Sequence, residues 1–400
     1  MNLIYRAINI LRAIVNYSFT KAYVWIIPLK VNKYFCMSML GNNYGDNIKC
    51  LADYICGVED GAIIVWGFTN EYYKKVDCDY VSTRLYSLNY YYHILTSKYI
   101  LTNQGINHKT LIKRKGQIVI QTWHGTCLKK IGSDINREKE ELNLIDRLFK
   151  PNPQNYYVNM TDIWISGSRF MSQIYKDKFS YSKPIFEIGT PRNDIFFGNN
   201  QEVIRKVKDF FGIPLTTQIV LYAPTFRSDK KITHYDIDAD EILDSLSCKY
   251  GQDFVFITRL HPVLLESNNE FGKMLGSKAI NASYYPDMQE LLYVADFLVT
   301  DYSSCMFDFM YSYKPILLYL ADKNEYSESR GFYFNIDSLP FLKVNSNKEL
   351  RDTILNYDEN HYREKITEFM ERIGSVETGH ATEATYNIIK GRTNNYNIYK

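Results

Sequence analysis

Gln117–Thr126 reads QIVIQTWHGT, in which a short run of β-branched residues ends close to a histidine and a glycine. The run Gln117–Thr122 is typical of a buried strand. A titratable side chain directly after such a strand lies at the carboxyl edge of the sheet, where α/β proteins usually place their chemistry. His124 is therefore a candidate functional residue, and Gly125 beside it lets a substrate approach the backbone closely.

Polar side chains follow other strand-like runs further along the chain. The stretches are YAPTFR at 222–227, TRLHP at 258–262 and TDYSS at 300–304. In a parallel sheet the carboxyl ends of neighbouring strands meet at one edge. We therefore expect the polar residues of these stretches to line one cleft together with His124. They are Thr225, Arg227, Thr258, Arg259, His261, Asp301, Ser303 and Ser304.

The TDYSS stretch predicts a strand, a turn and a helix in succession. Backbone N–H groups around Ser303 and Ser304 would point out of the start of that helix, where the helix dipole and the unpaired donors favour an anion. Arg227 and Arg259 suit a diphosphate, because a guanidinium group stays charged and forms paired hydrogen bonds with phosphate oxygens. The alternative, which stays open, is that Asp301 or Ser303 only caps the helix.

His124 and His261 are candidates for proton transfer. Histidine has an ordinary pKa of about 6.5, so it can take a proton from an alcohol at cellular pH and accelerate a reaction by about a hundredfold to ten-thousandfold. A lone histidine is more often a structural residue of the core, and this alternative stays open as well. The other histidines lack a strand-end setting and are expected to be structural or exposed: His93, His108, His234, His361 and His380.

Strand-like runs alternate with helical segments, which favours parallel sheets covered by helices. The runs are Ala62–Trp66, Gln117–Thr122, Ile163–Ile165, Ile185–Ile188, Gln218–Ala223, Phe254–Thr258, Phe297–Thr300 and Ile316–Leu320. We predict an α/β protein with two Rossmann-like lobes that face a cleft.

A domain boundary is expected near residues 195–215. A helix at Gln201–Phe211 would end at Gly212, with Pro214 beyond it. The predicted parts are a basic segment at 1–45, an N-terminal α/β lobe at 46–200, a C-terminal α/β lobe at 201–375, and a C-terminal helix at 376–400 that packs back towards the N-terminal lobe.

The composition is that of a soluble globular protein. Hydrophobic residues make up 46% and charged residues 23% of the 400 residues, and 47 basic against 45 acidic side chains leave a net charge of +2. Nothing in this balance favours nucleic acid as a partner. The seven cysteines are scattered without a CxxC pair or another metal-ligand spacing, which predicts reduced thiols in a cytosolic protein and no metal site.

The first 45 residues carry only basic charges, namely Arg6, Arg12, Lys21, Lys30 and Lys33. Apolar residues between positions 4 and 15 recur at helical spacing, as in an amphipathic helix on an anionic membrane surface. The alternative is a helix packed on the domain with solvated basic residues. No apolar run reaches the roughly 18 residues that span a bilayer, and no signal peptide is recognised, so we expect a protein that is neither membrane-spanning nor secreted.

Short motifs spread over most of the chain carry a resemblance to a known family. They are GNNYGDN at 41–47, SKY at 97–99, KRKGQ at 113–117, QTWHGTCLKKIG at 121–132, GTPRND at 189–194, YAPTFR at 222–227, RLHP at 259–262 and TDYSS at 300–304. Together they resemble the CDP-glycerol glycerophosphotransferases of teichoic acid synthesis. The chain departs from the family pattern at Cys127, Thr190, Phe226 and before Gly379, and none of these departures removes a candidate catalytic group.

The resemblance implies a GT-B-like fold with the acceptor on the N-terminal lobe and the CDP-linked donor on the C-terminal lobe. It implies transfer of glycerol phosphate from CDP-glycerol to a membrane-lipid-linked acceptor, with release of CMP. His124 would be the general base on the acceptor hydroxyl. The groups expected on the donor are His261, Arg227, Arg259, Asp301, Ser303 and Ser304, with Thr225 and Thr258 in support, and Arg192 and Asp194 would position the lobes or the acceptor.

The expected partners are CDP-glycerol, an acceptor on undecaprenyl diphosphate, and the cytoplasmic face of the cell membrane, where the protein would be peripheral. Several alternatives remain open: CDP-ribitol or another CDP-alditol as donor, a capsule polymerase, a nucleotide-sugar glycosyltransferase of GT-B fold, and an inactive protein that binds polyol-phosphate chains. No motif demands a cofactor, and the sequence decides neither whether Mg²⁺ assists nor how many subunits assemble.

Overall fold

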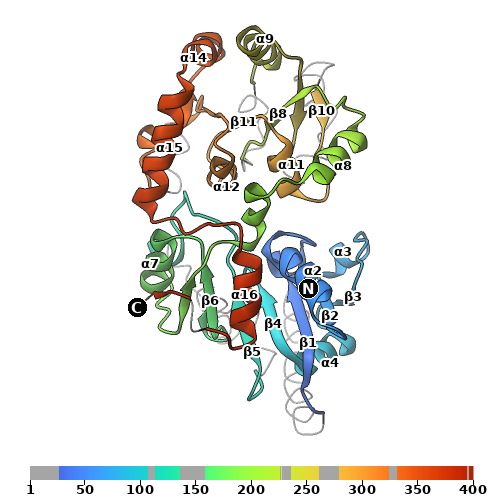
Figure 1. Ribbon diagram of the computed structural model, residues 1–400. Helices are drawn as coiled ribbons and strands as arrows, with labels where there is room; N and C mark the ends of the chain where they lie inside the picture. The colour runs from blue at the N-terminus through green and yellow to red at the C-terminus, as the bar shows by residue number, and fades with distance from the viewer. Residues whose placement is uncertain are drawn as a thin grey trace, which may run out of the picture. The chain divides into compact units, whose positions relative to one another are not determined.

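The computed structural model describes residues 27–106, 113–135, 158–225, 227, 236–260, 279–323, 331–393 and 396–399. The chain divides into two compact units (Figure 1). The first unit takes Met1–His124, Ile131–Arg192 and Val376–Lys400, and the second takes Gly125–Lys130 and Asn193–Ser375. Each unit is built on a parallel β-sheet covered by helices, which confirms the predicted α/β class with two Rossmann-like lobes of GT-B-like type.

The sheet of the first unit has the strand order β14-β7-β6-β5-β4-β1-β2-β3. Its strands are β1 (Lys30–Met37), β2 (Ile63–Phe68), β3 (Val81–Arg84), β4 (Ser97–Thr102), β5 (Ile118–Gln121), β6 (Ile163–Ser166), β7 (Ile185–Glu187) and β14 (Ile398–Tyr399). Neighbouring strands are parallel except β14, which pairs antiparallel with β7. The central strands are buried over most of their length, as strands covered on both faces are.

Helices cover both faces of this sheet. They are α2 (Asp46–Val58), α3 (Asn70–Tyr73), α4 (Leu88–Thr96), α7 (Arg169–Lys178) and α16 (Ala381–Ile389). Side chains alternate between the faces of a strand, so Tyr34 and Cys36 of β1 face the core under α2 and α16, whereas Phe35 and Met37 face the core under α4. Figure 1 shows α16 beside α2, on which it packs. The end of the chain is thus part of the first unit.

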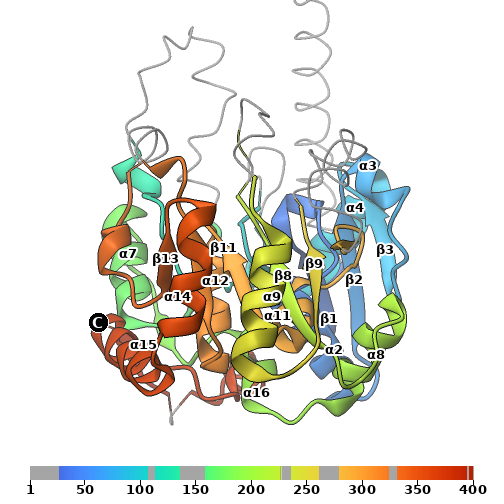
Figure 2. The same ribbon diagram turned by 90° about the horizontal axis from the view of Figure 1, so that it is seen from above.

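The sheet of the second unit has the strand order β10-β9-β8-β11-β12-β13, and all neighbours are parallel. Its strands are β8 (Gln218–Tyr222), β9 (Phe254–Thr258), β10 (Ala279–Asn281), β11 (Phe297–Thr300), β12 (Ile316–Tyr319) and β13 (Leu342–Val344). Its helices are α8 (Gln201–Phe211), α9 (Ala239–Tyr250), α11 (Met288–Val294), α12 (Cys305–Phe309), α14 (Leu350–Asn356) and α15 (Glu359–Ile373). Figure 2 shows α9 and α14 side by side, and both pack on one face of the sheet.

The strand order changes direction once in each sheet. In the first sheet β1, β2 and β3 follow one another to one side and β4, β5, β6 and β7 to the other, so the switch lies between β1 and β4. In the second sheet the switch lies between β8 and β11. Connections that leave the carboxyl edge on either side of a switch point diverge, and open α/β sheets bind their ligands there. Each unit therefore has one favoured ligand position.

The predicted strands are all present, with ends that differ by at most two residues, and the predicted helix Gln201–Phe211 is α8. Gly212 ends this helix with a φ of 67°, a left-handed conformation that suits glycine. One expectation needs correction: the basic segment predicted at 1–45 includes β1, a central strand of the first sheet. A membrane-associating segment would therefore have to end before Lys30. The amphipathic helix predicted near the start lies outside the described residues.

Most of the helices that can be described bury only part of their residues, whereas α12 is buried at every position. Among them, none has the length and the apolar composition needed to cross a membrane.

The core of the second unit provides a test of the fold. Leu317 in β12 is fully buried, whereas Leu215 is 56% exposed. We expect Leu317→Ala to lower the free energy of unfolding by about 2–5 kcal/mol, because it removes buried methyl groups and leaves a cavity. Leu215→Ala should change it by no more than about 0.5 kcal/mol. Urea unfolding of both variants measures the difference, and equal midpoints would contradict this description of the core.

Candidate functional site

His124 follows β5 in a loop whose backbone is strained. Trp123 has a φ of 56°, in the left-handed region that costs a residue with a side chain about 1–3 kcal/mol. This conformation is held from both sides: the N–H of Trp123 donates to Oε1 of Gln121 at 3.1 Å, and its carbonyl oxygen accepts from Nδ2 of Asn47 at 3.0 Å. The buried indole ring stacks on the imidazole with ring centroids 4.3 Å apart. The loop therefore fixes the direction of the His124 side chain.

The imidazole of His124 has a defined tautomer. Its Nδ1 atom lies 3.0 Å from the carbonyl oxygen of Asn103. A carbonyl oxygen can only accept, so Nδ1 carries the proton and Nε2 of the neutral ring keeps its lone pair. Burial lowers the pKa of His124 below 6.5, although the carboxylate of Asp46 acts in the opposite direction. The side chain is thus a neutral base at cellular pH.

The guanidinium group of Arg192 holds the backbone at His124. Its Nη2 atom donates to the carbonyl oxygen of His124 at 2.9 Å, and its Nη1 atom donates to Oδ2 of Asp46 at 2.9 Å. The backbone N–H of Arg192 donates to Oδ1 of Asn47, also at 2.9 Å. The side chains of Arg192 and Asp46 are only 10% and 12% exposed. Arg192 therefore joins the start of α2, the loop after β5 and the loop after β7.

The segment that carries Arg192 is anchored by residues from the end of the chain. Oε2 of Glu377 accepts the N–H of Thr190 at 2.8 Å, and the carbonyl oxygen of Pro191 accepts from the hydroxyl of Thr382 at 3.3 Å. A Cβ atom on Gly167 would lie 2.5 Å from Oε1 of Glu377, so this close approach requires glycine. The residues after Ser375 thus complete the carboxyl edge of the first sheet.

In the second unit, three strand ends share a buried ion cluster made of Arg227, Asp301 and Asp322. Their side chains are 6%, 6% and 11% exposed. Arg227 donates to Oδ2 of Asp301 at 2.9 Å and to Oδ2 of Asp322 at 2.6 Å, while Oδ1 of Asp301 accepts the N–H of Thr225 at 2.8 Å. Burial lowers the pKa of Arg227, but the hydrogen bonds and charges of Asp322 and Asp301 outweigh burial and raise it. The cluster ties the ends of β8, β11 and β12 together.

These contacts bear on the roles expected of Arg227 and Asp301. We predicted that Arg227 stabilises a diphosphate and that Asp301 orders a donor. In the structure the guanidinium group bonds two carboxylates and the carbonyl oxygen of Thr225, at 2.7 Å. Direct contact of either residue with a donor stays a prediction. In the structure, both residues belong to the ion cluster that holds the carboxyl edge of the sheet.

The other described residues that we predicted to contact the donor lie at or just after the ends of neighbouring strands. The sheet register pairs Tyr222 of β8 with Thr258 of β9 and with Val299 of β11. The polar residues after these strands therefore share one edge of the sheet. Thr258 is buried with its hydroxyl 3.4 Å from the carbonyl oxygen of Ile280. The residues with partial exposure at this edge are Thr225, Arg259, Ser303 and Ser304.

The guanidinium group of Arg259 is directed to backbone oxygens. Its Nη1 atom donates to the carbonyl oxygen of Tyr285 at 2.5 Å and lies 3.5 Å from that of Ala282. Ser303 and Ser304 come directly before α12, and the side chain of Ser304 makes no capping bond to that helix. The alternative that Asp301 or Ser303 caps the helix is not tested by this observation on Ser304.

Three predicted residues remain, namely His261, Gly125 and Asp194. His261 lies outside the described residues. Gly125 has a φ of 105° and begins the second unit, whereas His124 ends a segment of the first. Asp194 is partly exposed within the 3₁₀ helix Pro191–Phe197. A shared cleft for His124 and the donor-side residues stays a prediction.

Two residues of the site were missed by the sequence reasoning. Asn103 follows β4 and supplies the carbonyl oxygen that bonds His124, while its side chain accepts the N–H of Met39 at 2.8 Å. Asp322 follows β12 and completes the ion cluster. Asp322 comes shortly after the predicted run Ile316–Leu320, so the strand-end rule would also have identified it, whereas the strand before Asn103 was not among the predicted runs. In the described part of the chain, no group of three or more histidine, cysteine, aspartate or glutamate side chains is placed to hold a metal ion.

Comparison with known proteins places these features in context. A family model described as "CDP-Glycerol:Poly(glycerophosphate) glycerophosphotransferase" matches residues 19–391. The chain is 31% identical over 381 residues to the teichoic acid glycerol-phosphate transferase of Staphylococcus aureus (strain NCTC 8325 / PS 47), with 89% of this chain and 92% of that protein covered. It is 30% identical to the teichoic acid poly(glycerol phosphate) polymerase of Staphylococcus epidermidis, with 86% of this chain covered and 48% of the polymerase. The chain thus spans about half the length of that polymerase.

Solved structures agree with this comparison. The chain superposes on the wall teichoic acid polymerase TagF with a TM-score of 0.79 and 27% identity, covering 97% of this chain and 98% of that one. A TagF variant with histidine replaced by asparagine, soaked with CDPG, superposes with a TM-score of 0.79, 26% identity and 98% of each chain covered.

The hydrogen bonds and the ion pair that hold the loop at His124 can be tested by removing the guanidinium group of Arg192. We expect Arg192→Ala to lower the free energy of unfolding by about 3 kcal/mol, because it leaves the buried carboxylate of Asp46 without its cation. Arg169→Ala, at an exposed position at the start of α7, should change it by no more than about 0.5 kcal/mol. Urea unfolding provides both values. Equal unfolding midpoints for the two variants would show that the ion pair does not hold the loop.

Proposed function

This chain belongs to the CDP-glycerol:poly(glycerophosphate) glycerophosphotransferase family, and on that basis we propose that it transfers glycerol phosphate from CDP-glycerol to a lipid-linked acceptor in teichoic acid synthesis. The names of the relatives support the reaction, because they are a teichoic acid glycerol-phosphate transferase and a poly(glycerol phosphate) polymerase. The CDPG-soaked TagF structure supports the donor. The observation that carries the proposal is the neutral His124 with its lone pair on Nε2.

The proposed reaction is an attack on phosphorus. The acceptor hydroxyl oxygen forms a new bond to the distal phosphorus of CDP-glycerol, the bond from that phosphorus to the bridging oxygen breaks, and CMP leaves with the electron pair. Nε2 of His124 takes the proton of the hydroxyl, and the carbonyl oxygen of Asn103 stabilises the imidazolium through Nδ1–H. Arg192 acts through the backbone of His124 and is a positioning residue.

The donor is assigned to the carboxyl edge of the second sheet. Its switch point, between β8 and β11, carries Thr225 on one side and Ser303 and Ser304 on the other. Hydroxyl and N–H donors here would bind the diphosphate. The positive charges of Arg259 and His261 would stabilise the negative charge that builds up on the leaving group. Because Arg227 and Asp301 already neutralise each other, we assign them the task of holding Thr225 and the loop after β11 in place.

The acceptor side of the proposal includes the membrane. An acceptor carried on undecaprenyl diphosphate lies at the cytoplasmic face of the membrane, and each basic side chain near an anionic surface contributes about 1 kcal/mol of attraction. Arg6, Arg12 and Lys21 precede the first described strand and occur without an acidic neighbour. We assign the segment before Lys30 to peripheral attachment.

The transfer reaction is tested by replacing His124. With CDP-glycerol and a lipid-linked primer, His124→Ala should release CMP about a hundredfold to ten-thousandfold more slowly than the unchanged protein, the range for loss of a general base. His361→Ala, at an exposed position of α15, is the matched control and should keep the full rate. Because burial lowers the pKa of His124 below 6.5, the rate should stay level as the pH falls to 6.5 and drop only below it. CDP-ribitol in a parallel assay identifies the preferred donor, and a His124→Ala protein at full rate would exclude this mechanism.

Membrane attachment is tested by a deletion that spares β1. A protein lacking residues 1–26 should no longer sediment with vesicles that contain anionic lipid, and it should keep its activity on a soluble acceptor analogue. A second variant keeps residues 1–26 but has Arg6, Arg12 and Lys21 changed to glutamine, so it tests the charges without shortening the chain. It should bind the anionic vesicles more weakly than the unchanged protein. Unchanged sedimentation of both proteins would refute attachment through this segment.

A further inference from the structure

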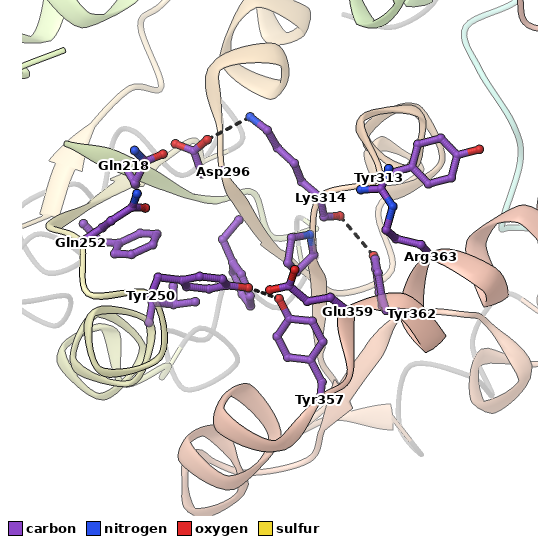
Figure 3. Close-up of a pocket in the computed structure, with 14 residues that line it drawn as sticks. Gln218, Tyr250, Gln252, Asp296, Tyr313, Lys314, Tyr357, Glu359, Tyr362 and Arg363 are labelled. Atoms are coloured by element: carbon purple, nitrogen blue, oxygen red, sulfur yellow. Dashed lines mark hydrogen bonds and ion pairs between the residues drawn. The ribbon is translucent and has the colours of Figure 1, made fainter. Parts of the chain in front are cut away.

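A pocket of about 210 Å³ opens at the amino edge of the second sheet (Figure 3). We call it the amino-edge pocket. Its walls come from the first residues of strands and from the ends of helices, and they include Gln218, Tyr250, Phe254, Asp296, Tyr357 and Arg363. All of these belong to the second unit.

The pocket lies at the end of the sheet opposite to the proposed donor site. Gln218 begins β8, whose other end leads to Thr225, and Phe297 begins β11, whose other end leads to Asp301. A strand of four or five residues spans about 13–17 Å at 3.3 Å per residue. A ligand in the amino-edge pocket therefore occupies a site separate from the donor.

The cation at the mouth of the pocket is placed to meet an anion. The guanidinium carbon of Arg363 lies 4.9 Å from the centroid of the Tyr313 ring. Among the described residues, no carboxylate pairs with this guanidinium group. Stacking on an aromatic ring leaves the N–H edge of a guanidinium group open to phosphate oxygens. The other pocket cation, Lys314, is already paired with Asp296 at 3.0 Å.

The rest of the pocket offers groups that bind hydroxyls. The hydroxyl groups of Tyr250 and Tyr357 contact each other, and the carboxylate of Glu359 accepts a hydrogen bond from the hydroxyl of Tyr250. Burial and this hydrogen bond both contribute to raising the pKa of Tyr250. Burial raises the pKa of Tyr357 to about 12, so its hydroxyl stays protonated. Gln252 adds an exposed amide to the lining, beside Gln218 (Figure 3). Carboxylate and amide oxygens accept hydrogen bonds from hydroxyl groups, whereas they disfavour a second anion beside them.

We propose that the amino-edge pocket binds a glycerol phosphate unit, with the phosphate on Arg363 and the hydroxyl groups on Glu359 and Gln252. The substrate class rests on the proposed function. The fit follows from a cation that, among the described residues, has no carboxylate partner and lies in the same lining as hydrogen-bond acceptors, and from a volume below the 300–1,000 Å³ or so that larger ligands need. A unit of the product polymer and free glycerol 3-phosphate present the same chemistry, and the test distinguishes them.

The experiment measures binding apart from transfer. The full chain carrying His124→Ala is held at saturating CDP-glycerol, which keeps the proposed donor site filled, and is titrated calorimetrically with glycerol 3-phosphate or with a synthetic trimer of glycerol phosphate. A second change, Arg363→Gln, should weaken binding about tenfold or more, the loss expected for a charge-assisted hydrogen bond. Arg372→Gln is the matched control, because Arg372 is on the same helix, stacks on Phe369 at 4.8 Å and does not line this pocket.

The outcomes separate the alternatives. Tighter binding of the trimer assigns the pocket to the product chain, and equal binding of both ligands assigns it to the free metabolite. Failure of both to bind, or equal binding by the Arg363→Gln and Arg372→Gln proteins, overturns the proposal. If glycerol phosphate binds as expected but the unchanged protein releases no CMP from CDP-glycerol, the proposed transfer reaction is wrong, whereas the amino-edge pocket is still a binding site for glycerol phosphate.

Discussion

The geometry at His124 depends on a salt bridge between residues far apart in the sequence. Arg192 and Asp46 are 146 positions apart, and their ion pair lets the same guanidinium group hold the carbonyl oxygen of His124. A loop beyond the end of a strand has lost its sheet partners, so its buried polar groups must find others. Here side chains supply them. The left-handed backbone of Trp123 can persist only because these surrounding contacts over-determine it.

The second unit also fixes its strand ends with a buried ion cluster, whose members bond the backbone of Thr225 as well as one another. Two carboxylates and one guanidinium group meet where β8, β11 and β12 end. Buried ion pairs contribute little net stability, because the cost of removing charges from water is close to the gain from pairing them. Their value here is geometric: each partner fixes the others, and Asp301 also fixes the backbone of Thr225. Because Arg227 is already paired with both carboxylates, we expect the hydroxyl and N–H donors at this edge to contribute to the proposed binding of a diphosphate.

The strands could be predicted where they are short apolar runs, and they were missed where burial involves polar residues. β1 reads KVNKYFCM and contains Lys33, which is 1% exposed and donates to the hydroxyl of Thr96 at 2.7 Å. A lysine of this kind makes a central strand look like a surface segment. β10 and β13 have three residues each, one of which is polar, Asn281 in β10 and Lys343 in β13. The strand-end rule predicted the candidate residues such as His124, but it did not predict their hydrogen-bond partners. Those partners depend on which strands are neighbours in the sheet. Nothing local in the sequence places β4 beside β5 and thus Asn103 beside His124.

The two edges of the second sheet differ electrostatically, and the difference explains what each can bind. At the carboxyl edge the chain enters its helices, so free N–H groups and positive dipole ends favour phosphate there. At the amino edge α9 ends at Tyr250 and α14 ends at Asn356, and Lys249 donates to the carbonyl oxygens of Leu355 and Tyr357. Of the helices named at the pocket, only α15 begins there. The start of α15 is capped by the side chain of Asp358, which accepts the N–H of His361, so we expect an anion at the amino edge to be held mainly by the charge of Arg363, from a position exposed to water. Such a contact is screened by solvent and is weak and reversible, which suits holding a chain that must move on and does not suit transition-state stabilisation.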